Sequence, residues 1–197
     1  MIVRGAERIA ASADELCALD RAIGDGDHGT NMKRGFDAVL AKVEDIAALP
    51  TGEALSAIGK TLVMTVGGAS GPLYGSFFLA AGAAMAGGRR LPENLTEVVA
   101  AGVAAVGARG RSTAGEKTML DVLVPVLDAL RAETGRPDAA GRIRATARQS
   151  AERTAPMLAT KGRAAYLGSR SVGHVDPGAR SSCVIVEAIC EIWEGGA

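Results

Sequence analysis

The amino-acid sequence predicts an all-α fold, an eight-helix antiparallel up-and-down barrel or bundle. Apolar residues recur at spacings of three and four residues in one segment after another, which is the period of an α-helix. No segment shows the two-residue alternation of a half-buried strand, and Cys183-Val-Ile-Val186 follows a helical period instead. The connections are short, which favours antiparallel neighbours. The length of 197 residues predicts one domain, residues 1–197, with a sizeable core.

The first predicted helix ends with an acidic residue that faces inward. Ile9, Ala13, Leu16 and Cys17 share one face of this helix, and Asp20 continues the same stripe. A carboxylate that points into a core needs a partner there.

In chain order, we expect helices over residues 4–19, 30–48, 51–66, 71–87, 95–106, 117–133 and 138–155, and from residue 177 onward.

Prolines and glycines bound the next three helices. The second helix stops before Pro50, Thr51 opens the third, and Pro72 stands in the first turn of the fourth. The stretch 61–88 carries no charge and is long enough to cross a membrane. The glycine-rich segment 67–72 divides it, however, so we expect a buried helix and no membrane span.

The remaining four helices follow a predicted surface turn at residues 89–92. The fifth helix matches the helical template at every step, and Pro125 is expected to kink the sixth. The seventh helix is rich in arginine and is expected to present a solvated face or a partner surface. Asp176 is the predicted N-cap of the last helix, with Pro177 at its first position.

Composition excludes several classes of function. The formal net charge is zero, so no overall field attracts nucleic acid or an anionic membrane. Aromatic residues make up 3% of the chain, which leaves few platforms on which single-stranded bases could stack. Cys17, Cys183 and Cys190 are odd in number and form no CxxC motif, and no signal peptide is evident. Reduced thiols and a cytoplasmic location are therefore expected.

The segment 19–31 carries the strongest signal for chemistry. It holds Asp20, Asp25 and Asp27 within eight positions, threaded with three glycines that permit positive φ angles. Like charges this close repel one another, and a folded chain keeps them mainly when a multivalent cation neutralises them. Oxygen ligands without EF-hand spacing indicate Mg²⁺, as in phosphoryl-transfer sites. The alternative reading is a solvated acidic turn.

Three further segments are candidates for the same site. The segment 67–75 is a glycine-rich loop at a helix N-terminus, which suits phosphate, although close packing of two helices would also explain its small residues. The segment 107–118 resembles a Walker A loop, but Glu116 stands at the lysine position and no strand precedes it, so that motif is excluded. The segment 161–179 is the longest irregular stretch.

These segments recur at every second connection of the predicted bundle. Alternate connections of an up-and-down bundle lie at the same end, so the segments 20–31, 67–75, 107–118 and 161–179 should gather on one face. The topology alone therefore predicts a ligand site at one end of the bundle.

Four motifs resemble those of the nucleotide-binding L subunit of dihydroxyacetone kinase. They appear in the family's order and span nearly the whole chain: Asp20-Arg-Ala-Ile-Gly-Asp-Gly-Asp-His-Gly-Thr-Asn-Met32, Gly67-Gly-Ala-Ser-Gly-Pro-Leu-Tyr-Gly75, Gly115-Glu-Lys-Thr-Met-Leu-Asp121 and Gly173-His-Val-Asp-Pro-Gly-Ala179. The resemblance implies an eight-helix antiparallel barrel with the nucleotide at one end. Glu116, where the family pattern has aspartate, is a mild departure.

The resemblance also implies roles for individual residues. Asp20, Asp25 and Asp27 would hold two Mg²⁺ ions that bridge the phosphates of ADP or ATP. A methionine rather than an aromatic ring under the adenine fits the low aromatic content. The residues implied to bind the nucleotide are His28, Gly29, Thr30, Asn31, Ala69, Ser70, Gly110, Met119, Arg163, Asp176, Pro177 and Gly178.

By this resemblance the chain is a phosphotransferase subunit that passes the γ-phosphoryl group of ATP to a ketose on a separate K subunit. No catalytic residue beyond the metal cluster is assigned. In one mode ADP stays bound and is rephosphorylated by a phosphotransferase-system M subunit, and in the other ATP exchanges freely. The sugar, the donor and the assembly, including a homodimer, stay open.

Other functions are compatible with the sequence. Relatives that act on another triose or a tetrulose share this nucleotide domain, and fatty-acid kinases carry a similar helical domain. A regulatory subunit that binds a transcription activator is an alternative of a different class, and a purely structural bundle is another. Stabilisation by Mg²⁺ and nucleotide would separate the last reading from the others.

Overall fold

The computed structural model describes residues 1–86, 90–91, 93–133 and 135–195. Every regular element in these ranges is helical, which confirms the predicted all-α fold. In chain order the elements are α1 (Ile2–Ala11), α2 (Ala13–Ile23), α3 (His28–Leu40), α4 (Val43–Ala47), α5 (Thr51–Thr65), α6 (Ser70–Ala84), α7 (Leu95–Gly110), α8 (Leu120–Glu133), α9 (Ala139–Glu152), the 3₁₀ helix η1 (Arg163–Ser171) and α10 (Pro177–Gly195).

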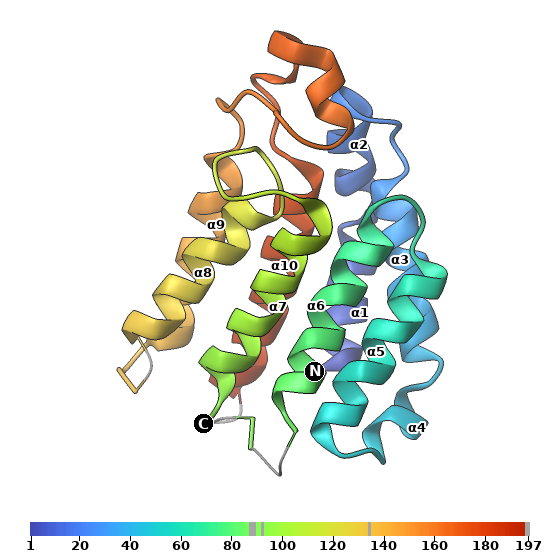
Figure 1. The fold of residues 1–197 in the computed structure, drawn as a ribbon, viewed down its shortest axis with the longest axis vertical. Helices are drawn as coiled ribbons and strands as arrows, with labels where there is room; N and C mark the ends of the chain where they lie inside the picture. Colours follow the sequence, from blue (N-terminus) through green and yellow to red (C-terminus); the bar gives the residue numbers. More distant parts are fainter. Residues whose placement is uncertain (87–89, 92, 134, 196–197) are drawn as a thin grey trace.

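The long helices close into a ring, which is the predicted up-and-down barrel (Figure 1). The helix pairs in contact around the ring are α1 and α3, α3 and α5, α5 and α6, α6 and α7, α7 and α8, α8 and α9, α9 and α10, and α10 and α1. The short α4 lies at one end of the barrel, and η1 lies at the other. The N-terminus and the C-terminal end of α10 lie at the α4 end, so the η1 end is built from internal connections.

Two predicted helices are each divided in two, so the described chain has more than eight helices. The segment expected as 4–19 breaks at Ser12, which has φ −97° and ψ 0° and separates α1 from α2. The segment expected as 30–48 breaks after α3, where the Lys42 amide donates to the Val39 carbonyl at 3.1 Å in a tighter turn. A hydrophobic period continues across such bends, so the sequence pattern did not reveal them.

Two boundaries around the later connections also differ from expectation. The sixth helix begins at Leu120 rather than residue 117, because Lys117 adopts a left-handed conformation with φ 62° that an α-helix does not contain. The segment 161–179, expected to be irregular, contains η1. The end of the fourth helix and the predicted turn at 89–92 lie partly outside the described residues.

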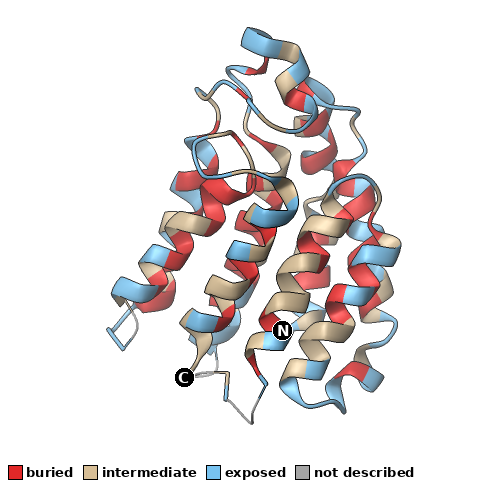
Figure 2. Ribbon diagram, in the orientation of Figure 1, coloured by how far each residue is buried: buried red, intermediate tan, exposed pale blue. Residues whose placement is uncertain are grey.

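The core lies inside the ring, and the apolar stripes of the helices fill it (Figure 2). Ile9 and Leu16 are fully buried, and they meet Leu62 of α5 and Val106 of α7 in one large cluster. Asp20 is also buried, as its place on the same stripe predicted. The inward stripe therefore delivers a carboxylate to the η1 end of the barrel.

The α5 and α6 helices approach so closely that side chains would not fit between them. A Cβ atom on Gly75 would lie 2.9 Å from the Gly59 carbonyl oxygen, and one on Gly59 would lie 2.8 Å from the Gly75 carbonyl oxygen. Gly52 near the start of α5 and Gly82 near the end of α6 repeat this arrangement. A Cβ on Gly82 would lie 2.5 Å from the Gly52 carbonyl oxygen. These glycines set the distance between the two helices.

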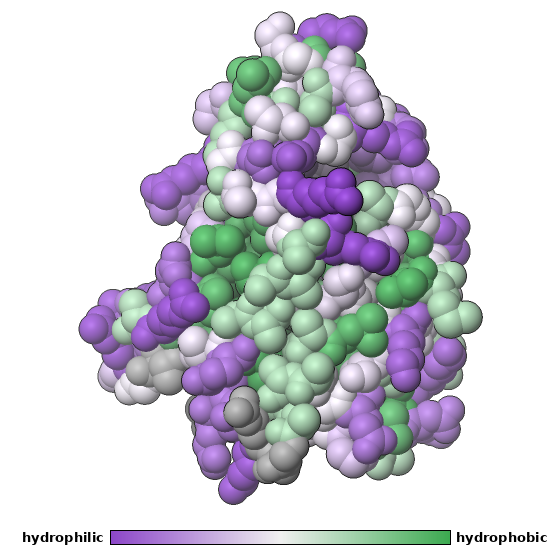
Figure 3. Space-filling view, viewed as in Figure 1, coloured by the Kyte–Doolittle hydropathy of each residue, from purple (hydrophilic) through white to green (hydrophobic). Residues whose placement is uncertain are grey.

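The uncharged helix α6 is only partly buried, contrary to the expectation of a buried helix. Its buried residues are Gly71, Tyr74, Gly75, Ala81 and Gly82, and most of the others are half-buried. Small residues cover its outward side, and a hydrophobic band runs down this face of the molecule (Figure 3). None of the described helices has the length and hydropathy needed to cross a membrane.

Candidate functional site

A cavity of about 460 Å³ opens at the η1 end of the barrel. All four predicted segments contribute to its wall, so the expectation that alternate connections gather at one end is confirmed. Two of the predicted residues, Gly29 and Thr30, do not line it. The predicted residues that do are Asp20, Asp25, Asp27, His28, Asn31, Ala69, Ser70, Gly110, Met119, Arg163, Asp176, Pro177 and Gly178.

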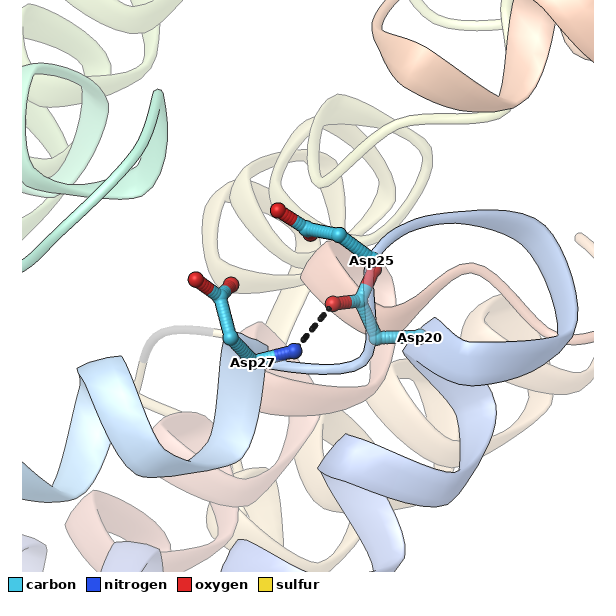
Figure 4. A group of neighbouring side chains, drawn as sticks. All are labelled: Asp20, Asp25 and Asp27. Atoms are coloured by element: carbon cyan, nitrogen blue, oxygen red, sulfur yellow. Dashed lines mark hydrogen bonds between the residues drawn. The ribbon is translucent and has the colours of Figure 1, made fainter.

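The three aspartates converge in the loop between α2 and α3 (Figure 4). Each offers one carboxylate oxygen, and these oxygens lie within 4.8 Å of one another. Asp25 and Asp27 are exposed, whereas Asp20 is buried. One oxygen of Asp20, Oδ2, accepts hydrogen bonds from the amides of Asp27 at 2.9 Å and His28 at 3.1 Å. Asp20 therefore fixes the N-terminus of α3 while its other oxygen stays available to a ligand.

The glycines of this loop serve three different purposes. Only Gly26 uses a positive φ, of 81°, which was the expected reason for all three. A Cβ on Gly24 would lie 2.1 Å from Oδ1 of Asp20, so the loop can pass this carboxylate only without a side chain. A Cβ on Gly29 would lie 1.9 Å from the Ala13 carbonyl oxygen. Gly29 thus lets α3 pack against α2, which explains its absence from the cavity wall.

The donor set of the acidic cluster fits a hard divalent cation. Its ligands are carboxylate oxygens alone, the type that Mg²⁺ and Ca²⁺ prefer. The Arg163 guanidinium lies 2.5 Å from Oδ2 of Asp25, and its side chain is 65% exposed. One guanidinium against three carboxylates leaves an excess of negative charge at the site, which a bound cation would neutralise.

His28 stands at the centre of a buried chain of hydroxyl groups. Its Nδ1 is 3.1 Å from the Ser70 hydroxyl, and its Nε2 is 2.8 Å from the Ser181 hydroxyl, which continues to the Tyr74 hydroxyl at 2.7 Å. Burial lowers the pKa of His28, against the opposing influence of Asp20 and Asp27. A neutral imidazole has one donor and one acceptor nitrogen, so the two serines play opposite roles. These hydrogen bonds connect Ser70 of the glycine-rich loop to Ser181 of α10.

Thr30 and Asn31 hold the start of α3 in place. The Thr30 amide donates to Sγ of Cys17 at 3.3 Å, and the Thr30 hydroxyl lies 3.5 Å from the same sulfur atom. The carboxamide oxygen of Asn31 accepts from Arg34 at 2.8 Å while the residue lines the cavity.

All three cysteines are free and buried. Burial raises the pKa of the Cys183 thiol to about 11, so this thiol is a poor nucleophile at neutral pH.

The cavity and the loop before α8 contain residues to which the sequence had assigned no role. Met119 and Gly110 line the cavity as expected, together with Arg109. Asp121 accepts from the amides of Gly115 at 2.5 Å and Thr118 at 2.7 Å, so it shapes the loop before α8. Asp121 was visible within a family motif but received no role. Lys161 and Tyr74 also line the cavity, and each likewise lies within a segment that was already a candidate.

Asp176 is a buried N-cap that lines the cavity, as predicted. Its Oδ2 accepts from the Ala179 amide at 2.7 Å, and its own amide donates to the Thr154 hydroxyl at 2.9 Å. Burial raises the pKa of Asp176 to about 7, and the charge of Asp121 raises it further, whereas the Ala179 amide and Lys117 act in the opposite direction.

This pKa makes stability depend on pH. The folded state holds the proton of Asp176 between about pH 4 and pH 7, whereas the unfolded state releases it near its ordinary pKa of 3.8. The stabilisation by this proton is complete below the pKa of the unfolded state, and it is lost as the pH rises through the pKa of the folded state. We expect Asp176→Asn, which carries no charge, to gain stability relative to wild type as the pH rises from 4 to 7.

Urea unfolding of both proteins without metal or nucleotide, at intervals from pH 5 to pH 8, measures this difference. Asp14→Asn, which removes an exposed carboxylate from α2, is the matched control, and its difference from wild type should change little over the same range. A constant difference between Asp176→Asn and wild type would show that Asp176 is ionised throughout.

The comparisons with known proteins agree with this geometry. The DAK2 domain matches residues 22–191. The ADP-binding subunit DhaL of PEP-dependent dihydroxyacetone kinase 1 from Listeria innocua is 42% identical over 94% of this chain and 90% of its own length. The ADP-binding subunit DhaL of the PEP-dependent dihydroxyacetone kinase from Escherichia coli K12 is 41% identical over 95% of this chain and 92% of its own length.

Solved structures share the fold. The native dihydroxyacetone kinase of C. freundii superposes on 97% of this chain with a TM-score of 0.78 and 25% identity. Its complex with AMP-PNP and Mg²⁺ gives a TM-score of 0.77 and 27% identity. The chain spans only 33% of that enzyme's length.

The expected fold and the expected class of enzyme, a phosphotransferase subunit, are thus confirmed at the level of the family. A family match over most of the sequence and relatives more than 40% identical along nearly their whole length lead to one conclusion. The chain belongs to the DAK2 domain family, in the group of dihydroxyacetone kinase L subunits to which its motifs pointed.

Proposed function

We propose that this chain, as a single domain over residues 1–197, is the nucleotide-binding subunit of a dihydroxyacetone kinase. It holds ADP or ATP with two Mg²⁺ ions and passes the γ-phosphoryl group to a ketose on a separate K-type subunit in the cytoplasm. One observation supports the proposal most strongly. Three converging carboxylates and the glycine-rich loop 67–70 line the same cavity, and the relatives with the same fold are named ADP-binding subunits.

The residues of the cavity divide the work of holding the nucleotide. Asp20, Asp25 and Asp27 would hold the metal ions, which neutralise phosphate charge when they are bound. The first amides of α6, which begins at Ser70, are available to a phosphate group. Met119 offers an apolar surface to the adenine ring.

Arg163 and His28 support this arrangement from two sides. Arg163, which contacts Asp25, can move from that carboxylate to a phosphate oxygen when cations occupy the cluster. His28 stays neutral and holds the Ser70 hydroxyl in place. Catalysis by this subunit consists of positioning and charge neutralisation, and the partner subunit supplies the site for the sugar.

The names of the relatives support one of the two possible phosphoryl donors. Both L subunits described above belong to PEP-dependent kinases. On this support we propose that the chain retains ADP as a cofactor and that an M-type phosphocarrier subunit rephosphorylates it. An ATP-dependent kinase, in which ATP exchanges freely, is the second candidate, and the complex of the C. freundii kinase with AMP-PNP and Mg²⁺ favours it.

The retained nucleotide is the quantity to measure. The protein is purified with or without chelator treatment and denatured in acid, and the released nucleotide is identified and counted. We expect nearly one ADP per chain, lost after chelation. Readily reversible binding of Mg·ATP without retained ADP would instead assign the ATP-dependent mode. A protein that neither retains nor binds nucleotide would contradict the proposed function.

A further inference from the structure

Lys117 is a buried cation that the proposed function does not use. Only 1% of its surface is exposed, and it follows directly on Glu116, the residue that excluded a Walker A loop. Its backbone lies in the left-handed region with φ 62°, which is unfavourable for a residue with a side chain. A conformation of this kind persists only where its surroundings hold it.

The ammonium group binds backbone carbonyls. Its nitrogen lies 2.6 Å from the carbonyl oxygen of His174, which comes shortly before α10. It also lies close to three carbonyl oxygens that come shortly after α9. These are the oxygens of Thr154 at 2.8 Å, Met157 at 3.1 Å and Ala155 at 3.3 Å. Lysine has three donors, so these four acceptors occupy the ammonium fully and leave none of its protons for a phosphate.

The four carbonyls belong to the two ends of the connection between α9 and α10. Residues 155–174 leave the barrel after α9 and return before α10, and η1 lies between these ends. The amide of Gly173 donates to the Ala155 carbonyl at 2.8 Å, which closes the base of the loop. Lys117 binds both sides of this base, so one side chain from a third segment holds the two ends together.

Few other contacts hold the loop to the barrel. Its apolar contacts form a small separate cluster in which Ala159 and Ala164 meet Ile23 of α2. Arg163 contacts Asp25, the Lys161 ammonium lies 3.9 Å from a carboxylate oxygen of Glu116, and the Thr160 amide donates to the Glu116 carbonyl at 3.3 Å. Because these contacts are few, the base of the loop decides where η1 and Arg163 lie.

We infer that Lys117 is the positioning residue that fixes the loop 155–174, and with it Arg163 and Asp176, against the nucleotide cavity. The inference rests on the proposed function for the identity of the ligand. Lys117 acts through the carbonyls that it binds and not by contact with phosphate. Asp121 supports it from within its own segment, since its carboxylate accepts from the amides on both sides of Lys117, those of Gly115 and Thr118.

Lys117→Met tests the inference because it keeps an unbranched side chain, one atom shorter than that of lysine, and removes every donor. Lys117→Gln retains two N–H donors, in a carboxamide group, so it serves as a milder second variant if the methionine variant does not fold. Val39→Ala is the matched control: it removes buried apolar volume from α3 in the main core, without a contact to the loop. Wild type must first bind Mg·ADP, because its failure to bind would contradict the proposed function and not the role of Lys117.

Two readouts separate positioning from general stability. The first readout is proteolysis: trypsin can cleave after Lys161, Arg163 and Arg170 within the loop. Mass spectrometry gives the rate of cleavage at these sites relative to the rate at sites elsewhere in the chain. Calorimetry gives the affinity for Mg·ADP. If the loop is in place in only a tenth of the Lys117→Met molecules, the apparent affinity falls about tenfold. We expect that loss, a similar rise in relative cleavage within the loop, and intermediate values for Lys117→Gln.

Val39→Ala should lower stability yet keep wild-type affinity and the wild-type distribution of cleavage. The inference is overturned if the lysine variant that folds binds Mg·ADP as tightly as wild type. It is equally overturned if its loop is cleaved no faster, relative to other sites, than the loop of Val39→Ala.

Discussion

Replacing Asp25 by alanine should weaken Mg²⁺-dependent nucleotide binding by at least about 100-fold, since loss of residues that merely orient metal ligands already costs about 10–100-fold. Asp25 is the best of the three aspartates for this test because it is exposed and its one ion pair is with Arg163 on the surface. Such a pair contributes at most about 1 kcal/mol to folding. The helices should therefore remain intact, as circular dichroism would show.

Titration calorimetry with ADP, in Mg²⁺ and in chelator, measures the effect. Asp37→Ala is the control, since Asp37 is an exposed aspartate of α3 whose ion pair with Lys33 lies on the surface. This variant should bind as wild type does. Normal Mg²⁺-dependent affinity in Asp25→Ala would remove the metal assignment.

Replacing Gly75 by alanine should destabilise the fold by roughly 3 kcal/mol, the upper part of the usual range for overpacking. The new Cβ would lie 2.3 Å from Cγ2 of Val63 and 2.9 Å from the Gly59 carbonyl oxygen. The second contact is with backbone, so no rotamer change relieves it, and α5 and α6 must move apart. The higher helix propensity of alanine recovers only about 1 kcal/mol.

Denaturant unfolding of Gly75→Ala and Gly5→Ala provides the measurement and its control. A Cβ on Gly5 of α1 would meet Phe36 at 3.5 Å, an ordinary contact distance. Gly5→Ala should therefore match wild type or exceed it in stability by up to about 1 kcal/mol. Equal stability of the two variants would mean that the α5–α6 distance is not fixed by its glycines.

Hydrophobic period, connection length and loop composition were sufficient to predict the all-α barrel and the end at which its cavity opens. The stripe that carries Ile9 and Leu16 also carries Asp20, so the burial of this carboxylate could be predicted from spacing alone. The bend at Ser12 could not, because the core face continues through it. Roles within a segment depended on neighbours distant in the sequence: Gly29 faces the Ala13 carbonyl and not the cavity.

By itself, the sequence determined the helices, the barrel, the converging aspartates and the family. These follow from local periodicity and from motifs in which each residue type has a chemical reason. The tertiary structure decided which groups complete the site: the pairing of Arg163 with Asp25, the chain of hydroxyls through His28, and the carbonyls that surround Lys117. Lys117 meets carbonyls 37 to 57 positions away, and contacts at such separations leave no periodic trace in a single sequence.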